Sequence, residues 1–364
     1  MSVGIKDVAA RAGVSVGTVS NVLNRPDTVK EPTRERVLSV IRELGFVRNE
    51  AARALRSGRG RTIGLLVLDV ANPFFTDVAL GAEAVADLNG AVVSVYNSAK
   101  LVDRELRHLD HLEEQRVQGV LVTPVDQDNP RLDLLVQRGT PVVLVDRGAG
   151  QRNRCSVAVD DVLGGALAGD HLLDQGHRRI ALVGGPLALP QVADRFRGLR
   201  ERVALRAPEV EPLLVETVNM TVADGRDAGT RLAGMSARRR PTAVFCANDL
   251  LALGLLQSLA QCDLRVPQDV AIVGYDDIEY AAAAVVPLSS VRQPRELLGR
   301  TAAELLFEEI NDSGRHQHRQ VVFEPELVVR QSSALARRAA RGRRSVPAPV
   351  ETSVSGGPLA RSAR

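Results

Sequence analysis

From residue 62 onward, short apolar runs alternate with amphipathic stretches, and this alternation limits the possible folds more than any other feature of the sequence. The runs are nearly continuous in valine, isoleucine and leucine, as at 63–68, 119–123 and 180–183. Such runs predict parallel β-strands covered by helices on both faces. The pattern extends over about 270 residues, more than one sheet of this kind usually spans, and it therefore predicts two lobes.

Polar side chains follow several of the predicted strands. Asp146, Asn248 and Asp276 each come at or just after the end of an apolar run. Ligands of parallel α/β sheets bind beyond the carboxyl ends of the strands, so we expect these side chains to converge in a cleft together with Arg195. Carboxylates and guanidinium groups can each hold two adjacent hydroxyls, which favours a sugar or sugar derivative as the ligand.

Two alternatives stay open for this cleft. Phe74 and Phe75 would form an apolar wall, and either ring could stack on a nucleobase or nucleoside, which is the second candidate ligand. Polar residues after strands can also cap the helices that follow, an explanation that applies most to Asp249 and Asp277.

The first sixty residues show a different pattern, with short helices predicted at 5–12, 16–24 and 32–44. Gly13 is placed to end the first helix and Ser15 to cap the second. Two helices joined by so tight a turn are typical of a helix-turn-helix, whose second helix enters the major groove of DNA. The alternative is an ordinary corner between two helices of a small bundle.

The second of these helices offers side chains that can read DNA. Asn21 can pair with adenine, and Val16 can contact a thymine methyl group. Gly17 has no side chain, so we expect few direct base contacts at that position. Donors for phosphate contacts are also present, and these are Lys6, Ser15, Thr18, Ser20 and Asn24.

Charge is unevenly distributed along the chain. The formal net charge is +3, but residues 1–60 carry 11 Lys/Arg against 6 Asp/Glu, and residues 335–364 carry 7 Arg against 1 Glu, which leaves residues 61–334 at −8. Basic ends around an acidic centre suggest that a polyanion meets the ends, although basic tails also serve solubility. Residues 335–364 contain almost no apolar side chains and are expected to be disordered.

Several classes of protein are disfavoured by the sequence. It contains no apolar run of about 18 residues that would predict a membrane span, and its start lacks the apolar region of a secretory signal. Three cysteines without a CxxC pair argue against a disulfide framework or a cysteine zinc site, so we expect a cytoplasmic protein. We find neither a nucleophile pattern nor a phosphate-binding loop, and we expect no enzyme, cofactor or metal. The histidines are interpreted as residues without a catalytic or metal-binding role. His108 and His111 are predicted to lie on a solvated helix face, and His316 and His318 in a polar turn.

These motifs together resemble the LacI/GalR family of bacterial transcription regulators, over residues 4 to about 334. The segments that carry the likeness are 5–15, 18–24, 33–37, 43–46, 49–55, 72–75, 145–147, 176–180, 247–249, 274–277 and 291–294. The resemblance implies an all-α helix-turn-helix domain followed by a two-lobed α/β core of the periplasmic-binding-protein type (type I). It places the headpiece at 1–48, a hinge helix and linker at 49–60, the core at 61–334 and a basic tail at 335–364.

The resemblance adds DNA-binding residues in the hinge. The family uses a leucine at the place of Leu55 as a minor-groove wedge that kinks the duplex. Arg53 and Arg56 flank it and suit phosphates or a narrowed groove, and Asn49 is placed to cap this short helix. So short a helix is marginal in water, and we expect it to form only when it docks on DNA.

The resemblance also adds effector-binding residues. Family members bind their small-molecule effector with residues that match Arg195, Asn248, Asp276 and Gln293, and Asp146 matches another. A stacking aromatic is frequent in the family near the place of Met220, and this departure bears on the ligand class. With the apolar wall, the predicted effector-binding residues are Phe74, Phe75, Asp146, Arg195, Met220, Asn248, Asp276 and Gln293.

The sequence thus predicts a ligand-responsive DNA-binding repressor that binds a near-palindromic operator as a homodimer. Some family members form tetramers through a C-terminal leucine repeat, which 335–364 lacks. Effector binding is expected to change the closure of the lobes and so the hinge helices, with either sign of response. Alternatives from other classes are a solute-binding protein with the same core and an enzyme built on it.

Overall fold

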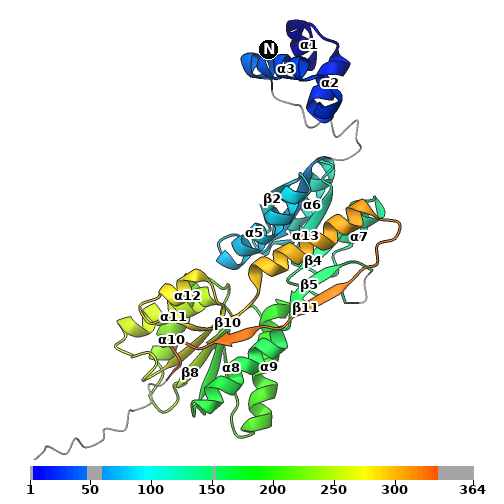
Figure 1. The fold of residues 1–364 in the computed structure, drawn as a ribbon. Helices are drawn as coiled ribbons and strands as arrows, with labels where there is room; N and C mark the ends of the chain where they lie inside the picture. The colour runs from blue at the N-terminus through cyan, green and yellow to red at the C-terminus, as the bar shows by residue number, and fades with distance from the viewer. Residues whose placement is uncertain (1–2, 47–59, 151–152, 335–364) are drawn as a thin grey trace, which may run out of the picture.

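The computed structural model describes residues 3–46, 60–150 and 153–334, and its first part is a small helical domain (Figure 1). This headpiece contains α1 (Ile5–Ala12), α2 (Val16–Asn24), the 3₁₀ turn η1 (Pro26–Thr28) and α3 (Glu31–Leu44). Gly13 and Gly45 end α1 and α3 in the left-handed conformation, with φ of 64° and 62°, which glycine adopts without steric cost. A compact apolar core holds the three helices together and consists of Val8, Ala9, Ala12, Val19, Val22, Val37 and Val40.

The first lobe of the core, here called the N-lobe, is built on a six-stranded parallel sheet of order β11-β5-β4-β3-β1-β2. Its strands are β1 (Thr62–Val67), β2 (Val92–Asn97), β3 (Gly119–Val122), β4 (Val142–Val145), β5 (Ser156–Val159) and β11 (Gln320–Phe323). The apolar runs are buried on both faces because helices cover both. One face packs against α5 (Pro73–Leu88) and α13 (Arg295–Asn311), and the other against α6 (Val102–Glu114) and α7 (Pro130–Gln137).

The second lobe, the C-lobe, repeats this plan with the strand order β12-β10-β9-β8-β6-β7, in which only β12 is antiparallel to its neighbour. Its strands are β6 (Ile180–Gly184), β7 (Leu213–Glu216), β8 (Ala243–Cys246), β9 (Ala271–Asp276), β10 (Ser289–Arg292) and β12 (Glu326–Val328). Its helices are α8 (Asp161–Asp174), α9 (Pro190–Arg206), α10 (Val222–Ala233), α11 (Asp249–Gln261) and the short α12 (Glu279–Ala283).

The chain passes between the lobes three times: from β5 to α8, from β10 to α13, and from β11 to β12. The N-lobe is therefore completed by α13 and β11, which follow the whole helical part of the C-lobe in sequence. Two glycines let α13 lie directly on α5, since a Cβ added at Gly81 would meet the backbone oxygen of Glu296 and one at Gly299 that of Val78. This close packing fixes the helix that joins the two lobes.

The predicted architecture of a helix-turn-helix domain and a two-lobed α/β core is confirmed. The elements that the sequence analysis did not predict are short or lie near sheet edges, and they are α7, α12, β10, β11 and β12. Hinge residues Asn49, Arg53, Leu55 and Arg56, like the tail at 335–364, lie outside the described residues. Among the helices that are described, none has both the length and the apolar character needed to cross a bilayer.

Candidate functional site

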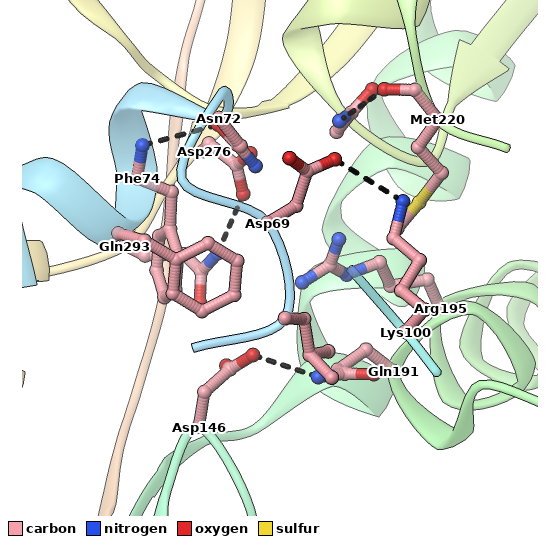
Figure 2. Close-up of a pocket in the computed structure, with 13 residues that line it drawn as sticks. Asp69, Asn72, Phe74, Lys100, Asp146, Gln191, Arg195, Met220, Asp276 and Gln293 are labelled. Atoms are coloured by element: carbon pink, nitrogen blue, oxygen red, sulfur yellow. Dashed lines mark hydrogen bonds and ion pairs between the residues drawn. The ribbon is translucent and has the colours of Figure 1, made fainter. Parts of the chain in front are cut away.

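A cleft lies between the lobes, where the carboxyl ends of both parallel sheets face each other (Figure 2). The structure brings together all eight residues predicted to bind an effector: Phe74, Phe75, Asp146, Arg195, Met220, Asn248, Asp276 and Gln293. Five further residues line it: Leu68, Asp69, Asn72, Lys100 and Gln191. The empty space between them, counted with the part open to solvent, is about 470 Å³.

Asp276 connects the two lobes across the cleft. It ends β9 with a φ of 101°, an unusual conformation for a residue with a side chain. Its Oδ1 accepts a hydrogen bond from Gln293 Nε2 at 2.7 Å, and its Oδ2 accepts one from Asn72 Nδ2 of the N-lobe at 3.1 Å. Burial raises the pKa of the Asp276 carboxyl above its usual range, against the opposing effect of Arg195. The carboxyl is thus desolvated and held by amide donors from both sides.

Asp146 makes the corresponding contact from the other lobe. It follows β4 with a φ of 57°, and its Oδ2 accepts a hydrogen bond from Gln191 Nε2 of α9 at 2.7 Å. Burial, together with the nearby charge of Asp161, raises the pKa of Asp146 to about 6. Two pairs of ligand-facing side chains therefore link the lobes in the structure, Asn72 with Asp276 and Gln191 with Asp146.

Arg195 is held rigidly beneath the cleft. Its Nε donates to Asp161 Oδ1 at 2.8 Å, and its Nη1 donates to the Ala247 carbonyl at 2.6 Å. The guanidinium carbon lies 3.6 Å from the ring centroid of Tyr275, whose hydroxyl also donates to Asp161 at 2.7 Å. Burial disfavours the guanidinium charge, but Asp161 and the other acidic groups around Arg195 raise its pKa, so it stays a cation.

Asn248 lines the cleft and also caps a helix. Its Oδ1 accepts a hydrogen bond from the backbone of Leu251 at 2.9 Å at the start of α11, and its Nδ2 donates to the Met220 carbonyl at 3.1 Å. Helix capping, the alternative weighed for such positions, thus holds for Asn248. Its neighbour Asp249 does not cap α11, because its carboxylate accepts from the Ser290 hydroxyl and the Ile278 amide.

Asp277 lies outside the cleft lining. It forms ion pairs with Arg292 at 2.7 Å and Arg330 at 2.5 Å. Although burial acts in the opposite direction, hydrogen bonds from these two arginines lower the pKa of Asp277. The adjacent acids Asp276 and Asp277 therefore have different environments, one facing the cleft and one anchoring the C-lobe.

The apolar wall of the cleft comes from the first turn of α5. The rings of Phe74 and Phe75 meet edge to face, with centroids 5.0 Å apart and planes at 82°. Asn72 caps this helix by accepting a hydrogen bond from the Phe74 amide at 3.1 Å, which fixes the wall relative to the polar groups. Met220 faces the cleft from the C-lobe, among residues that pack on its core.

Some buried polar atoms of the cleft have no hydrogen-bond partner among the described residues. They are Asp146 Oδ1, Gln191 Oε1 and Gln293 Oε1, all acceptors. Buried acceptors without partners cost free energy, and a ligand that donates hydrogen bonds would satisfy them. The site is therefore suited to a ligand with several donor groups beside an apolar face.

The second candidate surface is the start of α2 in the headpiece. Ser15 caps the helix by accepting a hydrogen bond from the Thr18 amide at 3.0 Å, and Asn24 donates to Ser20. The remaining predicted DNA-reading residues of this helix are exposed or half-buried: Val16, Gly17, Thr18, Ser20 and Asn21, with exposed Lys6 on α1. The helix-turn-helix thus presents the predicted side chains on its surface.

Some cleft residues that were not predicted from the sequence carry a signal that could have indicated them, and others do not. Asp69 follows β1 and Lys100 follows β2, and the two form an ion pair at 3.4 Å. The rule on strand ends that indicated Asp146 would have indicated them too. Gln191 and Asn72 lie at helix starts, and no local pattern marks a helix start as facing a distant strand.

Comparison with known proteins gives two family matches. Residues 4–49 match the model of bacterial regulatory proteins of the lacI family, and residues 169–333 match a periplasmic binding protein-like domain. The HTH-type transcriptional repressor PurR of Aliivibrio fischeri (strain MJ11) is 34% identical over 330 residues, which cover 90% of this chain and 97% of that repressor.

Solved structures show the same likeness. The lac repressor dimer bound to operator and the anti-inducer ONPF matches with a TM-score of 0.79 at 26% identity, covering 92% of this chain and 100% of that chain. The complex of the transcriptional regulator CelR with cellobiose matches with a TM-score of 0.66 at 34% identity, covering 91% and 100%.

Proposed function

The chain belongs to the LacI family of bacterial regulatory proteins, and on this premise we propose that its effector is a sugar or sugar derivative bound in the cleft. Like its relatives it is a ligand-responsive DNA-binding repressor and not an enzyme. The family assignment also sets aside a solute-binding protein, because the likeness to repressors covers the headpiece as well as the core.

The polar lining of the cleft carries the proposal on the ligand class. Carboxylates, amides and two cations surround the cavity, and three of the acceptor atoms have no hydrogen-bond partner among the described residues. A sugar presents hydroxyls around its whole rim, each of which can donate and accept, while an apolar ring face can lie on Phe74. The cellobiose complex of a regulator that is 34% identical shows that this fold can hold a sugar.

A nucleobase matches this lining less well. It offers fewer donor groups than a sugar, and all of them lie in the plane of the ring, so we expect it to satisfy fewer of the unpartnered acceptors. Stacking on Phe74 or Phe75 is the feature that would favour a base. The two ligand classes therefore make different predictions. Binding of a sugar should depend mainly on Asp276, and binding of a base mainly on stacking against the aromatic wall.

We propose that the headpiece reads a near-palindromic operator through α2, with Asn21 and Val16 at base edges. The phosphate contacts fall to Lys6, Ser15, Thr18, Ser20 and Asn24, and direct readout is thin at Gly17. Leu55, between Arg53 and Arg56 and after Asn49, is assigned the minor-groove wedge by family resemblance alone. The domain limits 1–48, 49–60, 61–334 and 335–364 complete this proposal.

A homodimer follows from the need for two headpieces on such an operator. The N-lobe carries exposed apolar side chains on three neighbouring elements, α5, β2 and α6, which supports an interface there (Figure 1). These side chains are Leu80, Leu88, Val92, Val95, Leu101 and Val102. The operator complex of the lac repressor, a structural relative, is likewise of a dimer.

The effector acts by shifting the closure of the lobes. Asn72 with Asp276 and Gln191 with Asp146 bridge the lobes through groups that also face the ligand. An effector that takes over these hydrogen bonds changes which lobe arrangement has the lower free energy. The headpiece, which precedes the first strand of the N-lobe, then responds to that change.

The test is a thermal-shift and calorimetric screen with pentoses, hexoses, disaccharides, sugar phosphates, nucleobases and nucleosides. A sugar should raise the Tm by mass action, and Asp276→Asn should weaken its binding by about 100-fold, through loss of a charged acceptor. Asp227→Asn is the matched control, since the side chain of Asp227 is 73% exposed on α10 of the same lobe.

Binding of a nucleobase or nucleoside to the wild type in preference to every sugar of the screen would contradict the sugar proposal. So would a sugar whose affinity is unchanged by Asp276→Asn. In either case operator binding, measured separately, would still test the repressor function.

A further inference from the structure

A second cluster of reactive side chains lies in the N-lobe, at the end of its sheet away from the cleft. Cys155 directly precedes β5, Glu309 lies in the last turn of α13, and His316 and His318 lie in the connection from α13 to β11. Their ligand atoms, one from each residue, all lie within 4.8 Å of one another. The cluster has no part in the cleft or in DNA reading.

The distances within this cluster are close to those of a metal site. Cys155 Sγ lies 3.1 Å from His316 Nε2 and 3.8 Å from His318 Nδ1, and Glu309 Oε2 lies 4.0 Å and 3.9 Å from the same two nitrogens. With zinc bonds of about 2.0–2.3 Å, the ligand atoms of a tetrahedral site lie about 3.3–3.7 Å apart. Adjustments of less than about 1 Å would bring the four atoms to that geometry.

The environment of the cluster leaves it without another evident role. Cys155 is fully buried, and Glu309 Oε2 is a buried carboxylate oxygen with no hydrogen-bond partner among the described residues. A cation within reach of Cys155 Sγ and Glu309 Oε2 would give that oxygen the partner it lacks. Arg319 does not supply that cation, because its guanidinium pairs with exposed Glu308.

One contact outside the four side chains also fits a bound metal. The Arg319 backbone amide points at Cys155 Sγ, with 3.4 Å between nitrogen and sulfur. Donors of this kind stabilise a thiolate that ligates a metal and orient it. The cluster therefore has four ligand side chains and one supporting donor.

The other histidine-rich segment of the N-lobe lacks these properties. On α6, His108 is hydrogen-bonded to the Asn97 carbonyl, and Asp110 and Glu113 pair with Arg131. The sequence predicts a solvated helix face here, and the structure shows His111 exposed, His108 half-buried and the acidic residues in ion pairs. The close approach of four ligand atoms, with Glu309 Oε2 lacking a hydrogen-bond partner among the described residues, thus distinguishes the Cys155 cluster from it.

We propose that Cys155, Glu309, His316 and His318 bind a divalent metal ion of the zinc class in a tetrahedral site. A thiolate and two imidazoles select zinc or a similar borderline ion over Mg²⁺ or Ca²⁺, which prefer oxygen ligands. Four protein ligands leave no open position, so the site is structural and not catalytic. The ion would tie the connection after α13 to the start of β5 and so hold β11 against its neighbour.

The test uses the full-length chain without an affinity tag, freed of metal by a chelator and kept reduced. Calorimetry with Zn²⁺ should give one ion per chain with a Kd below about 1 µM, and Zn²⁺ should raise the Tm. Co²⁺ should give the intense visible absorption and the thiolate charge-transfer band of a tetrahedral cobalt–cysteine site.

Variants assign the ligands. Cys155→Ser should abolish the thiolate band, and His316→Gln should weaken Zn²⁺ binding by at least about tenfold. The matched controls are Cys262→Ser and His108→Gln, which should bind as the wild type does. Circular dichroism of each metal-free variant shows whether it folds, and if Cys155→Ser does not, the His316→Gln and His318→Asn titrations decide.

Two results would overturn the proposal. One is a folded wild-type chain that takes up no Zn²⁺ at stoichiometric concentrations. The other is Zn²⁺ binding that the cluster variants leave unchanged, which would place the ion elsewhere on the surface.

Discussion

The headpiece and the cleft recognise their ligands with side chains in opposite environments. Val16 and Asn21 of the headpiece are exposed to water before any DNA arrives. Asp146, Arg195 and Asp276 of the cleft are almost fully buried, the two carboxylates held by glutamine amides and the guanidinium by Asp161. Burying charge costs free energy unless new partners replace water. Substitutions in the cleft should therefore change the stability of the core, whereas those on the reading surface should change recognition alone.

The largest effect is expected from Arg195→Met, which keeps an unbranched apolar stem and removes the charge. Asp161 would then be buried without its cation, and the Ala247 carbonyl would lose a donor. The free energy of unfolding, measured by urea denaturation, should fall by about 3–5 kcal/mol. The control is Arg197→Met, since Arg197 is 57% exposed on the same helix and its loss should cost less than about 0.5 kcal/mol. Equal losses for the two variants would remove the distinction between buried and exposed sites.

The pH dependence of stability provides the next test. The pKa of Asp146 is about 6 in the folded protein, against about 3.9 in an unfolded chain. The folded state thus binds more protons between these values, so this contribution to stability is fully present below about pH 4 and is lost as the pH rises through about 6.

Asp146→Asn removes that titration. The difference in unfolding free energy between it and the wild type should change between about pH 4 and 6 and be constant above. Asp227→Asn, at an exposed position of the same core, is measured beside it as the control. A constant difference for Asp146→Asn would show that its carboxyl is not desolvated.

A smaller effect is expected on the exposed side of the comparison. Asn21→Ala should reduce the discrimination between operator and random DNA by about 1–3 kcal/mol, measured by fluorescence anisotropy at one salt concentration. Because Asn21 is exposed, the unfolding free energy should stay within about 0.5 kcal/mol of the wild type. Ser39→Ala, at an exposed position of α3, serves as the control. Unchanged discrimination would count against a base contact by Asn21.

The smallest effect is expected at an exposed headpiece residue that, unlike its neighbours, also contributes to stability. Ser15 belongs to the reading surface, yet it caps α2 through the Thr18 amide. Ser15→Ala should lower the stability of this helix by about 1 kcal/mol, seen as faster amide exchange in α2 of the full-length protein. Ser15→Thr, which retains a capping hydroxyl, should recover most of the loss. Slow exchange in both variants would mean that tertiary packing alone holds the helix.

Local chemistry made most of the architecture predictable. Continuous apolar runs between helical stretches indicated parallel sheets, and Gly13 marked a helix end that the structure places at the same residue. The short strands β11 and β12 were missed because three or four half-exposed residues carry no distinct pattern. They are defined by their partners β5 and β10, which only the fold brings near.

The two clusters in the core differed in what the sequence could show. Strand ends gave Asp146, Asn248 and Asp276, because parallel strands all end on one edge. The spacing of residues along the sequence did not indicate the neighbours of Cys155. Its partners, from Glu309 to His318, follow only after the whole helical part of the C-lobe. The expectation of no metal site rested on spacing alone, and spacing along the sequence cannot show side chains that a crossing chain brings together.

The threefold crossing between the lobes also dictates when a newly made chain can finish folding. After β5 has left the ribosome, β11 follows only once the helical part of the C-lobe has been made. At about 5–20 residues per second this interval lasts roughly 10 to 30 s. During it the edge of β5 is unpaired, and such edges can pair with other chains. A ribosome that stops early therefore releases a polypeptide with the residues of a DNA-reading domain but with neither lobe complete.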